Sequence, residues 1–130
     1  MSKTVLHVPT LSQPRGVFCH GVKAEGQLVF VSGQVAYDAR GEIVGRGDIK
    51  AQTRQALENV KAVLEAAGAT MQDVTKVTVF VTNMAYLAQI HEVRAEYWPD
   101  PQHYPASTLV EVKSLVHPDL LIEIEAFAVI

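Results

Sequence analysis

Residues 48–68, with the sequence DIKAQTRQALENVKAVLEAAG, contain the pattern that decides the fold. Apolar and small side chains recur at three- and four-residue steps and charged side chains occupy the opposite side, which predicts an amphipathic helix. Asp48 can accept hydrogen bonds from first-turn amides, and Gly68 can adopt the left-handed conformation that ends helices. One face of this helix must therefore pack against another element.

The segments on either side of this helix favour β-structure, since they are rich in β-branched and aromatic residues. After the first of them, the sequence DARG at 38–41 predicts the turn of a hairpin. The predicted strands are 28–34 (LVFVSGQ), 74–82 (VTKVTVFVT), 107–112 (STLVEV) and 120–129 (LLIEIEAFAV).

A second, shorter helix is expected between the predicted strands 74–82 and 107–112. Asn83 is its predicted N-cap and Pro99 ends it. Its apolar stripe consists of Leu87, Ile90, Val93 and Tyr97. The order of elements is strands, helix, strand, helix, strands, so we expect an α+β fold with a mixed β-sheet and both helices on one face.

The balance of apolar and charged residues points to self-association. The chain has 130 residues, which we expect to form one domain over 1–130, and 48% are hydrophobic but only 19% charged. No element is left to cover the second face of the sheet, so we expect sheet faces to meet between subunits. The candidate surfaces are the face of Val77, Val79 and Val81 and the face of Leu121 and Phe127.

Composition also excludes several classes of partner. The net charge is −3 and there is no lysine or arginine run, so we expect no nucleic-acid partner. No apolar run is long enough to cross a membrane or act as a signal peptide, so we expect a cytoplasmic protein with no membrane partner. Five scattered histidines predict no metal site. Cys19 is expected to be a buried thiol, with a thiolate nucleophile beside His20 as the alternative.

Five blocks of this sequence, taken in order, closely resemble the Rid family, also called the YjgF/YER057c/UK114 group and labelled L-PSP endoribonuclease-like. The similarity runs from about Gly16 to Val129. The blocks are Leu28–Gln34, Ala51–Gly68, Val77–Thr82, Pro105-Ala106 and Glu123–Ala126.

The resemblance implies a chorismate-mutase-like α+β fold and a homotrimer whose three sheets form a barrel-like core. It also implies that a small-molecule substrate or ligand binds in the clefts between subunits. The best-known activity in the family is hydrolysis of reactive enamines and imines to a carbonyl compound and ammonia. That reaction uses no metal and no organic cofactor, so none is expected here.

The family pattern is changed at the position that binds the substrate carboxylate. Deaminating members hold this carboxylate with an arginine in a Pro-Ala-Arg-Ser pattern, whereas this chain has Pro105-Ala106-Ser107-Thr108. A hydroxyl offers weaker hydrogen bonds than a guanidinium and no charge. Ser107 and Thr108 are candidate hydroxyl donors in the site, or ordinary strand residues.

Other family positions are retained unevenly. Phe18 matches the family tyrosine and lacks its hydroxyl, and Leu109 matches the family cysteine. Glu123 matches the glutamate implicated in placing water; Glu125 is expected to be an outward or interface carboxylate. The family turn is intact at Ser32, Gly33 and Gln34.

A cation on the second helix is a candidate replacement for the missing arginine. Arg94 follows His91 by three residues, so the two side chains project from neighbouring positions. We hypothesise that both border the cleft and supply its positive or proton-shuttling group. The alternative is that Arg94 is a solvated residue whose stem covers the apolar stripe.

Three functions remain open from the sequence. The first is a Rid-type deaminase in which Glu123 and Ser107 are catalytic and which acts on a non-standard enamine or imine. The second is a non-catalytic small-molecule-binding or interaction protein with the same trimeric fold. The third is the ribonuclease or translation inhibitor of the older family label, against which the acidic balance argues.

Overall fold

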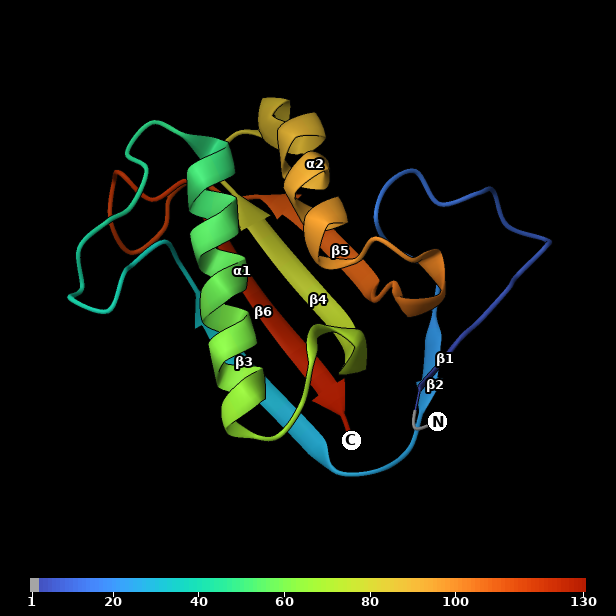
Figure 1. The fold of residues 1–130 in the computed structure, drawn as a ribbon. Coiled ribbons are helices and arrows are strands. Elements are labelled where there is room, and N and C mark those ends of the chain that lie inside the picture. The colour runs from blue at the N-terminus through green and yellow to red at the C-terminus, as the bar shows by residue number, and fades with distance from the viewer. Residues whose placement is uncertain (1–2) are drawn as a thin grey trace.

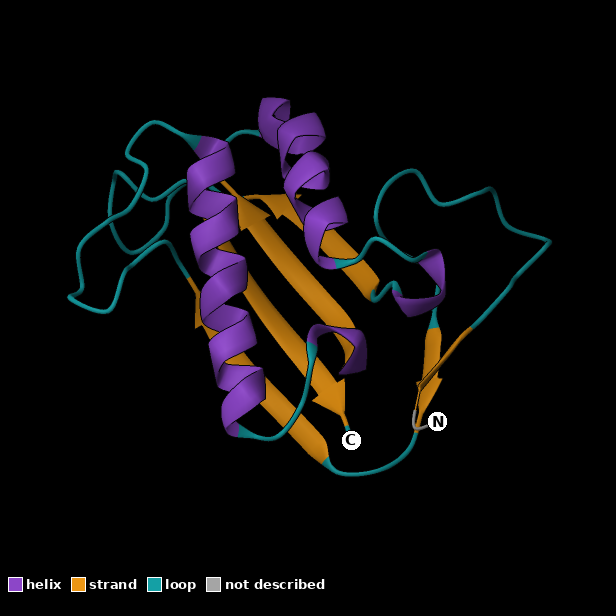
Figure 2. Ribbon diagram, in the orientation of Figure 1, coloured by secondary structure: helices purple, strands orange, loops and turns teal. Residues whose placement is uncertain are grey.

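The computed structural model describes residues 3–130, in which two α-helices cover one face of a four-stranded sheet (Figures 1 and 2). The elements in chain order are β1 (Lys3–Val5), β2 (Val22–Ala24), β3 (Leu28–Gln34), α1 (Ile49–Ala66), the 3₁₀ turn η1 (Met71–Asp73), β4 (Val74–Val81), η2 (Met84–Tyr86), α2 (Leu87–Tyr97), η3 (Pro101–His103), β5 (Ala106–Glu111) and β6 (Ile122–Val129).

The main sheet has the strand order β3-β6-β4-β5 and is mixed. Strand β6 is antiparallel to both β3 and β4, whereas β4 and β5 are parallel. Helix α1 follows β3 and leads to β4, and α2 joins β4 to β5, with both helices on the same side (Figure 1). The expected α+β class with both helices on one face is confirmed.

The ends of α1 have the predicted physical causes. The Asp48 carboxylate accepts a hydrogen bond from the Ala51 amide at 3.1 Å, which satisfies one of the free N–H groups of the first turn. Gly68 has φ +79°, in the left-handed region, and its amide donates to the carbonyl of Glu65. The helix therefore begins and ends where the sequence predicts.

The two faces of the sheet differ sharply in exposure. Val77, Val79 and Val81 lie under the helices and are at most 1% exposed, so the proposal that these valines meet another subunit is wrong. On the opposite face, Phe30 is 66% and Phe127 is 41% exposed, and their rings pack edge to face at 5.4 Å. The open, apolar face is therefore the one that carries Phe127.

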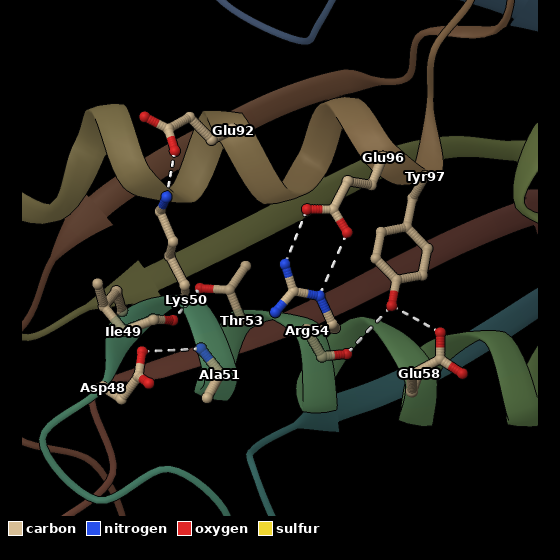
Figure 3. A network of polar contacts seen from close by, with 10 residues as sticks. All are labelled: Asp48, Ile49, Lys50, Ala51, Thr53, Arg54, Glu58, Glu92, Glu96 and Tyr97. Atoms are coloured by element: carbon tan, nitrogen blue, oxygen red, sulfur yellow. Dashed lines mark hydrogen bonds and ion pairs between the residues drawn. The ribbon is translucent and has the colours of Figure 1, made fainter.

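Polar contacts join α1 to α2 (Figure 3). The Arg54 guanidinium donates two hydrogen bonds to the Glu96 carboxylate, at 2.8 and 3.2 Å. A second ion pair joins Lys50 to Glu92, and the Tyr97 hydroxyl donates to the carboxylate of Glu58. These contacts fix α2 against α1, and α2 carries Arg94 and His91.

Several local expectations differ from the structure. The last strand begins at Ile122 and not at residue 120. Asn83 caps η2, whose Ala85 amide it binds, and α2 begins only at Leu87. The turn at 38–41 forms, but only a single bridge between Tyr37 and Ile43 follows, since no second strand pairs there. The short pair β1–β2 was not predicted, because three-residue strands carry too little periodicity to detect.

Candidate functional site

A cavity of about 260 Å³ lies between α2, β5 and the loop before β2. We call it the helix-side cavity. Its lining contains Phe18, His91, Arg94, Ser107 and Leu109, all predicted from the sequence. It also contains Arg15, Met84 and Leu87, which were not assigned to a site.

Arg94 is the central polar group of this cavity. Its side chain is only 1% exposed, so the alternative that it is a solvated helix residue is wrong. One guanidinium nitrogen donates to the Ser107 hydroxyl at 3.1 Å and another donates to the Val17 carbonyl at 2.8 Å. The cation therefore lies directly beside Ser107.

The charge of Arg94 lacks a protein counter-ion within the described residues. No carboxylate forms an ion pair with it, and its buried Nε atom has no hydrogen-bond partner. Burial lowers the pKa of Arg94 to about 10, so the guanidinium still carries its charge at neutral pH. A buried cation without an anion is costly, which suggests that an anionic ligand completes the site.

His91 lies one turn from Arg94 and is packed against the loop. Its Nδ1 atom accepts a hydrogen bond from the Val17 amide at 3.4 Å, which leaves the proton of a neutral ring on Nε2. Burial and the Arg94 charge lower the pKa of His91, so the neutral form is favoured. The ring stacks on Phe18 with centroids 6.5 Å apart.

Gly16 makes this packing of His91 possible. Its φ is +142°, a conformation that L side chains rarely adopt. A Cβ atom at this position would lie 2.4 Å from Cε1 of His91, so only glycine allows the loop to approach the ring.

Strand β5 places its alternate residues on opposite faces. Ser107 and Leu109 pair with Val77 and Val79 and share their helix-covered face. Thr108 points to the other face, where its hydroxyl accepts a hydrogen bond from Lys76 at 2.7 Å. Thr108 is therefore separate from the helix-side cavity of its own chain.

A second group of predicted residues gathers around β3 and β6. The register of these strands shifts between Val31 and Gln34, so a bulge places Ser32 and Gly33 opposite Glu125. Gly33 also lies against the side chain of Glu123. A Cβ atom at Gly33 would lie 2.0 Å from Oε2 of Glu123, so this glycine makes room for the carboxylate. The Gln34 side-chain amide donates to the Ser32 carbonyl.

The two groups lie far apart within one chain. Strands β3 and β5 are the opposite edges of the sheet, three strand spacings or about 14 Å apart, whereas Glu123 on β6 is two spacings or about 9 Å from β5. Glu123 also lies on the open face and Ser107 on the helix-covered face. A site that used both groups would need a second chain.

Two further predictions concern Cys19 and metals. Cys19 is buried, its thiol donates to the Gly21 carbonyl, and burial raises the pKa of the thiol, all of which fit a structural role. Among residues 3–130, no three His, Cys, Asp or Glu side chains gather as metal ligands would.

No helix within residues 3–130 has the length and hydropathy to span a membrane.

A larger cavity of about 580 Å³ lies on the other side of Phe18, under the loop between β1 and β2. Phe18 lines both cavities. The sequence gives no signal for this cavity or for Arg15, because an irregular loop has no periodicity that indicates where its side chains point.

Comparison with known proteins identifies the family. Residues 10–130 match the family described as Endoribonuclease L-PSP. A RutC family protein of Pyrococcus horikoshii is 47% identical over 127 residues, which cover 97% of each chain. A Rid family protein of unknown function from Yersinia pestis, YyfB, has 39% identity and a TM-score of 0.91 over the whole of both chains. Escherichia coli TdcF, solved with bound serine, has 36% identity and a TM-score of 0.73, with 97% of this chain and 98% of that chain covered.

The match therefore extends over nearly all of the sequence and all of the sheet and helices. The chain belongs to the Rid family, the YjgF/YER057c/UK114 or L-PSP group.

Proposed function

We propose that this protein is a hydrolytic enamine/imine deaminase in which Arg94 takes over the anion-binding role of the missing family arginine. The observation that carries the proposal is the buried Arg94 guanidinium, hydrogen-bonded to Ser107 and without a carboxylate partner among residues 3–130. A cation in this place can hold a substrate carboxylate through charge-assisted hydrogen bonds. The anion would then be held from α2 rather than from β5.

The reaction needs water and one proton carrier besides the anion site. An enamine first tautomerises to its imine, and water then adds to the C=N carbon. Glu123 would accept a proton from that water and return it to the nitrogen, which gives a carbinolamine. Transfer of the remaining hydroxyl proton to the nitrogen by Glu123 then breaks the C–N bond and releases a carbonyl compound and ammonia. The neutral His91 ring would donate a hydrogen bond from Nε2, and Phe18 and Leu109 would form apolar walls.

We infer that the complete site lies between chains of a homotrimer. Two observations support this inference: Arg94 lies on the helix-covered face and Glu123 on the open face of one sheet, and the open face exposes Phe30 and Phe127. A cyclic trimer would bring the β5 edge of one chain to the β3 edge of the next. The open apolar faces would then be buried in the core.

A subunit-mixing experiment tests both parts of this proposal. Arg94→Met and Glu123→Gln are each expected to abolish hydrolysis of enamines generated in situ, followed by the decay of their absorbance. Unfolding and refolding the two variants together should restore activity at about a quarter of the sites, since an intact Arg94 then faces an intact Glu123 of the neighbouring chain. No recovery in mixed trimers would contradict a shared site.

A non-catalytic binding protein is the second candidate. It is favoured by Phe18 and Leu109, which lack the hydroxyl and the thiol of the family positions. If wild-type protein binds a carboxylate but hydrolyses no enamine faster than buffer does, the binding function stands and the deaminase proposal is wrong.

A further inference from the structure

The helix-side cavity contains a second arginine that the proposed function does not use. Arg15 lines the cavity and is exposed, whereas Arg94 is buried. No aspartate or glutamate is among the lining residues. The cavity therefore has a cation at its buried end and another at its solvent side, with no protein anion between them.

The loop that carries Arg15 is held firmly to α2. The Val17 carbonyl accepts a hydrogen bond from Arg94 and the Val17 amide donates to His91. Gly16, between Arg15 and Val17, is packed directly against the His91 ring. Two residues of chain span at most about 7 Å, so the Cα atom of Arg15 lies within that distance of the Cα atom of Val17. Val17 is the residue whose carbonyl Arg94 contacts.

The spacing and the walls restrict the ligand. A monoanion on Arg94 would leave Arg15 without a partner, whereas a second anionic group a few bonds away would meet it. Besides the two arginines, the lining consists of the apolar side chains of Phe18, Met84, Leu87 and Leu109 together with His91 and Ser107. A volume of about 260 Å³ accommodates only a small molecule.

We propose that the helix-side cavity selects a small dicarboxylate, with one carboxylate on Arg94 and the other on Arg15. The substrate is then the enamine or imine of a short dicarboxylic acid, a statement that rests on the proposed deaminase function. Arg15 is the specificity-determining residue, and its guanidinium discriminates against substrates that end in an apolar group.

Matched ligands of equal chain length test this selectivity by calorimetry. The probes are glutarate and pentanoate, which differ only in the second carboxylate. Wild-type protein should bind glutarate at least about tenfold more tightly than pentanoate. Arg15→Met should remove this preference and leave pentanoate affinity unchanged, and Arg15→Lys should keep part of it. Arg40→Met, at an exposed arginine in the turn at 38–41, serves as the charge-matched control.

The outcomes separate this inference from the proposed function. Equal affinities for glutarate and pentanoate, both lost in Arg94→Met, would overturn the dicarboxylate proposal and leave the Arg94 anion site standing. An equal loss of affinity for both ligands in Arg15→Met would also overturn it, because Arg15 would then stabilise the fold or bind the first carboxylate. Binding that is unaffected by Arg94→Met, or no binding of either probe to the wild type, would overturn both.

Discussion

Replacing Arg94 by methionine separates the two roles that a buried arginine can have. A structural arginine stabilises the fold, whereas an arginine held for a ligand costs stability and supports binding. Methionine fills a similar volume and is flexible, so it can occupy the same space without a charge. The two roles predict opposite results for stability and for binding.

The expected change in stability follows from two opposing terms. Burial lowers the pKa of Arg94 from its ordinary value to about 10, and a shift of this size corresponds to a cost of about 3 kcal/mol for holding the charge in the fold. The two hydrogen bonds from the charged guanidinium to Ser107 and Val17 return about 1.5 kcal/mol each, the lower end of the range for a charged donor. The unfolding free energy of Arg94→Met should therefore differ from that of the wild type by less than about 1 kcal/mol at pH 7.

The sign of the pH dependence provides a second check. The native state releases the Arg94 proton at a lower pH than the unfolded chain, so its stability rises as the pH passes from about 10 toward 12.5. The wild type should gain stability relative to Arg94→Met in this range. Urea unfolding followed by tryptophan fluorescence measures both effects.

Ligand binding should respond far more strongly than stability. Loss of one or two charge-assisted hydrogen bonds to a carboxylate should weaken binding of pentanoate by at least about tenfold, measured by calorimetry with Arg40→Met as control. A loss of several kcal/mol of stability in Arg94→Met, with unchanged carboxylate affinity, would refute the argument and make Arg94 a structural residue.

Three other substitutions test separate parts of the structure. Gly33→Ala should lower enamine turnover at least about tenfold with little change in melting temperature, because the new Cβ displaces the Glu123 carboxylate. Gly21→Ala, where the nearest atom is 3.4 Å from the new Cβ, should leave turnover unchanged in the same assay. The buried Lys3 ammonium donates to three carbonyls, and burial lowers its pKa to about 8. The wild type should therefore gain stability over Lys3→Met as the pH rises from 8 to 10.5. If the difference in unfolding free energy, measured with urea, does not change over this range, this titration is excluded. Arg54→Ala should lower the unfolding free energy by less than about 1 kcal/mol, since its ion pair on α2 is half exposed, and a larger loss would show that this contact positions α2 more strongly than expected.

The main helix and sheet strands could be predicted because their patterns are local. The stripe of α1 and the alternation of β4 and β6 each show which face is buried, and Asp48 and Gly68 mark the helix ends without any tertiary information. The short β1–β2 pair depends on contacts between distant segments, such as Lys3 with the carbonyl of Val74, and no local pattern reports these.

The candidate site could be predicted only in part. Family positions indicated Ser107, Phe18, Leu109 and Glu123, and helical spacing indicated Arg94. Periodicity alone could not show that Arg94 is buried, since α2 is weakly amphipathic and a charged residue on such a helix is usually solvated. Its burial depends on Ser107 and Val17, which approach it from β5 and from the N-terminal loop.

A crystal structure of the protein with bound glutarate tests the central claim most directly. The account predicts a carboxylate within hydrogen-bond distance of the Arg94 guanidinium, beside Ser107, with Glu123 of a neighbouring chain facing the same ligand. A carboxylate bound away from Arg94, or a helix-side cavity that no neighbouring Glu123 approaches, would contradict it.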